Sequence, residues 1–216
     1  MADMDYTGIF NEISELLQKG RAKEIVAAVQ KALDMGVFPG DVLEKALMEG
    51  MNVVGGKFHR NEIYVPEVLI AARAMNRAAE VLKPHLVKAG VNPIGKAVIC
   101  TVKGDLHDIG KNLVKMMIEG KGIEVEDLGV DCDSQKIVDT VKESGAKVVC
   151  LSALLTTTMT AQKDVIDALK NAGIRDKVKV MVGGAPVTQS YADEIGADAY
   201  TADAASAAEV CRAFYA

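Results

Sequence analysis

The chain has 216 residues, half of them hydrophobic, and a formal net charge of −5. This composition supports a full hydrophobic core and excludes a chain that is disordered as a whole. Because no long basic run occurs, neither nucleic acid nor an anionic membrane is an expected partner. No apolar stretch reaches the roughly 20 residues that span a bilayer, and the acidic start MADMDYTGIF lacks the pattern of a signal peptide. We therefore expect a soluble, cytoplasmic protein.

Residues 1–88 show helical periodicity and little that predicts a strand. Apolar residues recur at helical spacing in IFNEISELL and in KEIVAAVQKALDMG. Two further helices are expected in PGDVLEKALMEGMNVVG and PEVLIAARAMNRAAEVLKP, each opened by a proline, and the second is expected to end before Pro84. Between them, GGKFHRNEIYV is interpreted as a loop. Four helices of this length predict a small bundle.

Residues 89–95 are a predicted linker, and the periodicity changes after it. Strand-like runs then alternate with helical ones, in the order KAVICTV, IEVEDLG, AKVVCLSA, VKVMVGG and ADAYTAD. Their apolar, β-branched composition is typical of parallel strands that are covered on both faces. We expect residues 96–216 to form a doubly wound, Rossmann-like domain with a five-stranded parallel sheet of flavodoxin-like order.

Three loops of this domain differ from ordinary connections. They are GDLHDIG after the first strand, SALLTTT after the third and GGAP after the fourth. In the expected order these three strands are neighbours, and ligands of such sheets bind beyond the carboxyl ends of the strands. The polar and glycine-rich loops are therefore expected to converge on one crevice.

The first of these loops places His107 two residues after Asp105. In an extended segment such side chains point the same way, so the carboxylate can bind one ring nitrogen and leave the other as a base or a metal ligand. The ordinary alternative is a solvated histidine in a turn or a helix cap. A single histidine cannot hold a free zinc or iron ion, because such sites need three or four protein ligands. A metal at His107 would therefore come with its own chelate, such as a macrocycle.

Four cysteines, at positions 100, 132, 150 and 211, form no CxxC pair. Cys100 and Cys150 lie in apolar, strand-like runs, where a free cysteine behaves as a small hydrophobic residue. We expect buried structural thiols, and the spacing gives no support to a thiolate zinc site.

DLHDIG resembles the Asp-x-His-x-x-Gly signature of base-off, His-on cobalamin-binding domains. SALL and the pair Gly183–Gly184 resemble the Ser-x-Leu and glycine elements that follow it, in the same order. EKALMEGMNVVGGKFHRNEIYVPEVLIAARAM is similar to the helical cap of cobalamin-dependent methionine synthase and of methyltransferase-associated corrinoid proteins. The resemblance covers nearly the whole chain, and at this length it is closest to the free-standing corrinoid proteins of methanogen and acetogen methyltransferase systems.

The resemblance implies that His107 is the lower axial ligand of cobalt, that Asp105 orients it, and that Thr158 extends this relay. It also implies that the nucleotide tail passes between strand and helix at Gly183 and Gly184. The other residues it places around the cofactor are Gly104, Leu106, Asp108, Gly110, Ser152, Leu154, Thr156 and Ala205. In the cap, residues 1–88, it implies that Phe58, Val65 and Glu44 serve the upper, methyl-bearing face, while ordinary bundle core is the alternative for Phe58 and Val65.

The implied function is methyl carriage by a bound cobalamin or related corrinoid. Cobalt(I) would accept a methyl group through a substrate-specific methyltransferase, and methyl-cobalt(III) would pass it to a pterin or thiol through a second methyltransferase. The chain would be a non-catalytic carrier subunit, with a reductive activator protein as a further partner and a cap that moves aside at each transfer. The donor, which could be methanol, a methylamine, a betaine or an aromatic methyl ether, stays open, as do the acceptor and the lower base.

Three other classes are less consistent with the sequence. The cobalamin-binding part of a radical mutase shares the signature but lacks this helical cap and works beside a barrel domain. A cobalamin-dependent light sensor or gene regulator usually carries a basic DNA-binding domain, whereas residues 1–88 hold 11 Lys and Arg against 12 Asp and Glu. A cofactor-free response-regulator-like protein would need clustered acidic residues where the His107 loop stands.

Overall fold

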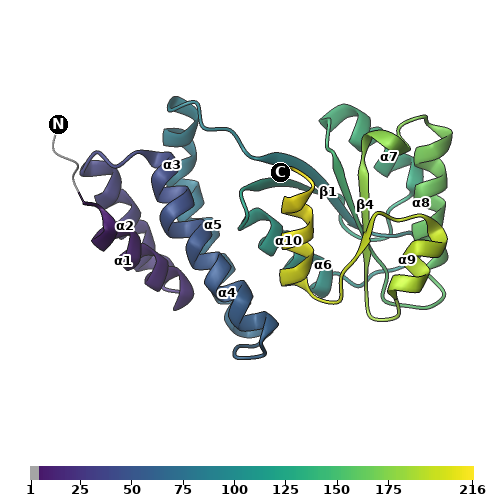
Figure 1. The fold of residues 1–216 in the computed structure, drawn as a ribbon, viewed down its shortest axis with the longest axis horizontal. Coiled ribbons are helices and arrows are strands. Elements are labelled where there is room, and N and C mark those ends of the chain that lie inside the picture. Colours follow the sequence, from purple (N-terminus) through teal and green to yellow (C-terminus); the bar gives the residue numbers. More distant parts are fainter. Residues whose placement is uncertain (1–4) are drawn as a thin grey trace. The chain divides into compact units, whose positions relative to one another are not determined.

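The computed structural model describes residues 5–216, and its chain divides into two compact units. The first extends to Asn92 and the second begins at Pro93. The first unit is helical, and the second alternates strands with helices (Figure 1). Among the described residues no helix is long and apolar enough to cross a membrane.

The first unit contains the expected four helical segments. They are α1 (Thr7–Gln18), α2 (Ala22–Asp34), a continuous segment of α3 (Pro39–Asp41), the π-helical η1 (Val42–Met48) and α4 (Glu49–His59), and finally α5 (Val65–Lys88). Helix α2 packs against α1 and α5, and α4 packs against α1 and α5. Fully buried side chains from all four segments meet in this bundle, among them Ile13, Ile25, Met51 and Leu82.

Two boundaries in this unit differ from the expectation. Helix α4 continues through Gly55 and Gly56 to His59, so Phe58 lies on a helix and the loop spans only residues 60–64. Helix α5 continues past Pro84 to Lys88. A proline inside a helix removes one backbone hydrogen bond, but the buried Leu82 before it and the half-buried Leu86 after it keep this part of the helix on the bundle.

The second unit holds a five-stranded sheet in which all paired strands are parallel. The strands are β1 (Gly95–Thr101), β2 (Ile123–Asp127), β3 (Val148–Ser152), β4 (Lys179–Gly183) and β5 (Ala199–Tyr200), in the spatial order β2-β1-β3-β4-β5. This is the flavodoxin-like order that was predicted. The strands β1, β3 and β4 lie side by side, so the loops that follow them emerge at one edge.

Helices cover both faces of this sheet (Figure 1). Helices α6 (Ile109–Glu119) and α10 (Ala204–Ala213) pack together on one face, and α7 (Ser134–Ser144), α8 (Thr160–Asn171) and α9 (Gln189–Ile195) lie on the other; a short 3-10 turn, η2 (Arg175–Lys177), precedes β4. The three inner strands are almost entirely buried. In the edge strand β2, buried or half-buried residues alternate with exposed ones, so the expectation that every strand is covered on both faces was wrong for β2. All four cysteines are free and buried, as predicted.

Candidate functional site

His107 lies in the irregular loop between β1 and α6. The side chain of Asp105 is 0% exposed, while that of His107 is 51% exposed. Nδ1 of His107 lies 2.7 Å from Oδ1 of Asp105. The expected contact between the two side chains is therefore present, and Nε2 is the ring nitrogen left for another partner.

Both carboxylate oxygens of Asp105 accept further hydrogen bonds. Oδ1 accepts from the backbone N–H of His107 (3.1 Å), and Oδ2 accepts from the N–H of Leu154 (2.7 Å) and from the hydroxyl of Thr158 (2.7 Å). Burial by itself would raise the pKa of Asp105, but these donors outweigh it and hold the pKa well below its usual value. Asp105 is therefore an anion that ties the loop after β1 to the loop after β3.

The three consecutive threonines of the second loop have different environments. Thr158 is buried and donates to Asp105 and to the carbonyl of Leu155 (2.9 Å), whereas Thr156 and Thr157 are exposed. The structure thus identifies Thr158 as the hydroxyl that joins the Asp105–His107 pair.

Large apolar side chains stand exposed on both loops and at the first residue of α6. The exposed fractions are 72% for Leu106, 74% for Ile109, 40% for Leu154 and 43% for Leu155. Exposed apolar side chains gathered at one place are typical of a binding surface. Around a half-exposed imidazole, they suit a large, flat and partly apolar ligand.

The two glycines after β4 differ in how strictly the backbone requires them. Gly184 has a φ of 125°, and a Cβ there would lie 1.8 Å from the carbonyl oxygen of Ala153. A Cβ on Gly183 would make only ordinary contact, 3.6 Å from the carbonyl oxygen of Thr201. Gly184 is therefore required by close approach of the loops after β3 and β4, a reason that the sequence did not provide.

The remaining expected site residues fall into two groups. In the second unit, Gly104 has a φ of 81°, and the side chain of Asp108 accepts a hydrogen bond from that of Asn112 (3.2 Å). Gly110 lies in the first turn of α6, and Ser152 is the last residue of β3. Ala205 lies in the first turn of α10 and is 7% exposed. In the first unit, Glu44 is exposed in η1, Phe58 is half-buried on α4, and Val65 is half-buried as the first residue of α5.

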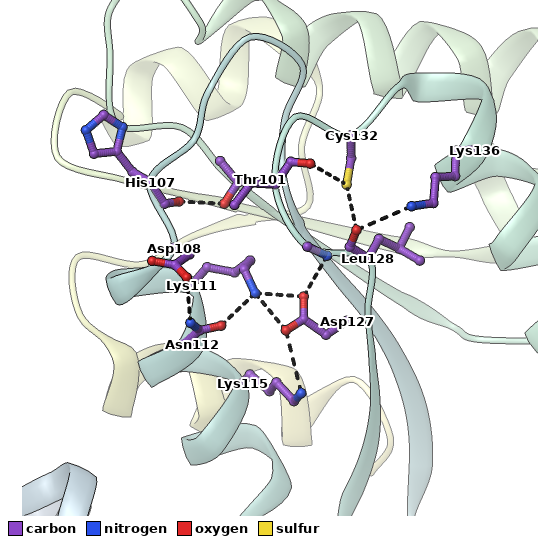
Figure 2. Close-up of polar contacts among 12 residues, drawn as sticks. Thr101, His107, Asp108, Lys111, Asn112, Lys115, Asp127, Leu128, Cys132 and Lys136 are labelled. Carbon is purple, nitrogen blue, oxygen red and sulfur yellow. Dashed lines mark hydrogen bonds and ion pairs between the residues drawn. The ribbon is translucent and has the colours of Figure 1, made fainter.

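Several residues that support the His107 loop were not predicted. The hydroxyl of Thr101 donates a hydrogen bond to the carbonyl of His107 (2.7 Å). Figure 2 shows this bond, and it shows the imidazole of His107 pointing away from the other labelled side chains. Lys111 is buried in α6, and its ammonium group lies 2.7 Å from both Asp127 oxygens and from the Asn112 side chain (Figure 2). The side chain of Asp131 accepts a hydrogen bond from the backbone N–H of Gly104 (2.8 Å).

Gln162 was also missed, although the sequence carried a signal for it. It occupies the apolar stripe of α8 together with Val165, Ile166 and Leu169. Its side-chain nitrogen donates to the carbonyls of Leu151 (3.0 Å) and Gly183 (3.2 Å), and its Oε1 is buried with no hydrogen-bond partner among the described residues. A lone amide on an otherwise apolar helical face indicates a buried polar partner, here the ends of β3 and β4.

Within residues 5–216, no group of three or more His, Cys, Asp or Glu side chains is placed to hold a metal ion. His107 offers one imidazole, and its neighbours are apolar or already engaged with the protein. The donor set therefore fits a metal that is already chelated and takes one further nitrogen ligand.

Comparison with known proteins assigns both units. A model described as B12 binding domain matches residues 95–211, and a second model with the same description matches residues 9–83. The chain is 41% identical to dimethylamine corrinoid protein 3 of Methanosarcina acetivorans, over 96% of each chain. It is also 41% identical to monomethylamine corrinoid protein 2 of the same organism, over 96% of this chain and 97% of the other.

A solved structure agrees with the sequence relatives. The methanol:cobalamin methyltransferase complex MtaBC of Methanosarcina barkeri contains a chain that matches 98% of this chain and 81% of its own length, with a TM-score of 0.87 and 30% identity. Fold and site thus define a B12-binding protein whose cofactor is cobalamin or a related corrinoid. Within that class, the chain belongs to the family of methyltransferase-associated corrinoid proteins.

Proposed function

We propose that this chain is the methyl-carrying corrinoid protein of a methylamine methyltransferase system, with His107 as the lower axial ligand of its cobalt. The observation that carries the proposal is the buried Asp105 carboxylate, which binds Nδ1 of a half-exposed His107, so that Nε2 is the ring nitrogen left for another partner. The bound corrinoid supplies the chemistry, because its cobalt accepts and releases the methyl group. The chain supplies the ligand and its orientation.

Asp105 holds the imidazole in one tautomer. An ionised carboxylate accepts a hydrogen bond from protonated Nδ1, so Nε2 would keep the lone pair with which the imidazole could bind the cobalt. Because Leu154 and Thr158 keep Asp105 ionised, a fixed negative charge faces Nδ1 of the imidazole.

The other expected residues receive roles on the same proposal. Leu154 and Thr156 would line the tail channel or the lower face of the corrin, Ser152, Gly183 and Gly184 would border the nucleotide tail, and Leu106 would lie among the cofactor-binding residues. Gly104, Asp108, Gly110 and Ala205 complete the cofactor surroundings in the second unit. In the first unit we assign Phe58, Val65 and Glu44 to the methyl-bearing side, which makes residues 1–88 a cap and residues 89–95 its linker.

The donor class follows from the relatives. The two corrinoid proteins described above carry the names dimethylamine and monomethylamine, and each aligns over nearly its whole length. We infer a methylated amine as the donor, delivered by a substrate-specific methyltransferase in the cytoplasm. A second methyltransferase that uses a pterin or thiol acceptor and a reductive activator protein complete the proposed system.

The axial ligand is tested by reconstitution of the full chain with aquocobalamin. We expect stoichiometric uptake by the wild type with the visible spectrum of imidazole-ligated cobalt, and a water-ligated spectrum for His107→Ala. His85→Ala is the control, since this half-buried histidine lies in the other unit on α5. Equal spectra for the wild type and His107→Ala would refute the assignment of the ligand.

The donor is tested separately with the reduced, reconstituted protein. It is mixed in turn with a dimethylamine, a monomethylamine or a methanol methyltransferase and the corresponding substrate, and formation of methylated corrinoid is followed by its absorbance. Methylation with either amine and not with methanol supports the amine assignment. Methylation with methanol alone would overturn the donor while leaving the carrier role intact.

A further inference from the structure

The backbone that carries His107 is fixed by residues outside the cofactor signature. Asp131, in the loop between β2 and α7, contacts the turn formed by Lys103, Gly104 and Asp105. Its side chain accepts the N–H of Gly104 (2.8 Å), and its own N–H donates to the carbonyl of Asp105 (2.9 Å). Two hydrogen bonds of opposite direction thus join one residue to two successive residues of the turn.

Asp131 makes both bonds from an uncommon conformation. Its φ is 51°, and among the described non-glycine residues only Asn61, with a φ of 57°, shares a positive value. Aspartate and asparagine tolerate this left-handed region better than most residues, but a non-glycine residue there is still strained. Such strain persists where the surrounding structure fixes the residue.

The loop around Asp131 provides that fixation. The N–H of Gly129 donates to Asp127 (2.9 Å), and its carbonyl accepts from the N–H of Thr101 (2.9 Å). The N–H of Cys132 donates to the carbonyl of Thr101 (3.1 Å), and the Cys132 thiol donates to the carbonyl of Leu128 (3.2 Å). Figure 2 shows the Cys132 thiol and the Lys136 ammonium group meeting at the Leu128 carbonyl.

The ion pair of Asp131 does not explain the contact. Nζ of Lys103 lies 3.8 Å from the Asp131 carboxylate, and both side chains are about half exposed. Exposed pairs at this distance contribute little. The main contribution of the carboxylate is therefore its shorter hydrogen bond with the N–H of Gly104.

On these contacts we propose that Asp131 is a positioning residue for the axial ligand. It holds the turn from which Asp105 and His107 project, while Thr101 holds the carbonyl of His107 from the end of β1 (2.7 Å). Its hydrogen bonds reach the backbone of Gly104 and Asp105, so it acts through the turn and not through the His107 ring. This inference rests on the proposed function of His107.

Three variants separate the acceptor from the backbone strain. Asp131→Asn keeps an acceptor oxygen and tolerates a positive φ, Asp131→Gly keeps only the backbone freedom, and Asp131→Ala loses both. Asn61→Gly is the matched control, because it changes the other positive-φ residue, which lies in the first unit. Circular dichroism checks that each variant is folded.

The first readout needs no cofactor. Amide hydrogen exchange in the apoprotein is measured at two positions. The N–H of Gly104 donates to Asp131, and the N–H of His107 donates to Asp105. We expect Asp131→Gly and Asp131→Ala to accelerate exchange about tenfold or more at both amides, the effect of losing one hydrogen bond to a charged group. Asp131→Asn and Asn61→Gly should leave both rates close to those of the wild type.

The second readout is the dissociation constant for aquocobalamin together with the spectrum. We expect affinity to fall about tenfold in Asp131→Gly and further in Asp131→Ala, with a growing water-ligated fraction, while Asp131→Asn resembles the wild type. A different outcome would overturn the proposal: faster amide exchange at Gly104 alone, with the His107 amide still protected and the affinity for aquocobalamin unchanged. Asp131 would then stabilise only its own turn and would not position His107. If the wild type takes up no aquocobalamin, the proposed function fails, and exchange at His107 still decides whether Asp131 positions it.

Discussion

At the scale of single residues, the carboxylate of Asp105 is the centre of the site. It accepts hydrogen bonds from the backbone and ring of His107 on one oxygen and from Leu154 and Thr158 on the other. A buried carboxylate with this many donors is strongly stabilised as an anion. Its charge has consequences for stability as well as for ligand orientation.

Because the pKa of Asp105 is lower in the folded chain than in the unfolded one, Asp105 stabilises the fold above its unfolded pKa of about 3.9. This contribution is lost as the pH falls below that value toward the folded pKa. We expect Asp105→Asn to lower the free energy of unfolding by about 1–3 kcal/mol at pH 7, since an amide cannot accept every donor. Urea unfolding of the apoprotein at several pH values measures it, and a difference that stays constant down to pH 2 would contradict the lowered pKa.

The threonine run offers a direct test of which hydroxyl serves Asp105. Thr158→Val removes the donor to Oδ2 and leaves a buried acceptor short of one partner, which should cost about 1–2 kcal/mol of stability. It should also weaken the binding of aquocobalamin. Thr157→Val, at an exposed neighbour, is the control and should change neither quantity. Equal effects of the two variants on stability and on aquocobalamin binding would show that Thr158 has no special role at the site.

At the scale of elements, the ends of β3 and β4 form one unit. Gly184 approaches the carbonyl of Ala153 too closely for any side chain, and Gln162 bonds the carbonyls of Leu151 and Gly183 from α8. The N–H of Leu154, one residue beyond Ala153, reaches Asp105. The spacing of these strand ends therefore sets the position of the donor to Asp105.

Neighbouring glycines give a matched pair of variants for this element. Gly184→Ala places a Cβ 1.8 Å from a backbone oxygen at a φ of 125°, so we expect a loss of more than about 3 kcal/mol or an insoluble product. Gly183→Ala meets its nearest atom at 3.6 Å and should cost less than about 1 kcal/mol. Thermal and urea unfolding of both variants measure this difference, and similar losses would refute the geometric explanation.

The strand order, the helical first unit and the Asp105–His107 contact were all predictable, because periodicity and short sequence spacing determine them. The conformation of Asp131 and the bonds of Thr101 and Lys111 were not, since they join segments that are apart in sequence through tertiary contacts. Phe58 was misplaced because two glycines were interpreted as the end of a helix, whereas α4 continues through them. Tertiary packing outweighs the low helix propensity of glycine at these positions.

At the scale of the whole molecule, cofactor binding should appear as stability. A ligand that binds only the folded chain adds about 2.7 kcal/mol at 100 times its dissociation constant. We expect aquocobalamin at that excess to raise the free energy of unfolding of the wild type and of His85→Ala by this amount. At the same concentration the increase for His107→Ala should be smaller, because its affinity is lower, and equal increases would argue against the axial bond.

The central claim is that a ring nitrogen of His107 binds the cobalt. The most direct measurement is the electron paramagnetic resonance spectrum of the full chain reconstituted with cobalamin in the cobalt(II) state, prepared with ordinary and with ¹⁵N-labelled histidine. We predict axial-nitrogen splitting that changes from triplets to doublets on labelling and disappears in His107→Ala. Triplets that persist with labelled histidine would mean that the benzimidazole base still holds the metal, and would contradict the role assigned to His107.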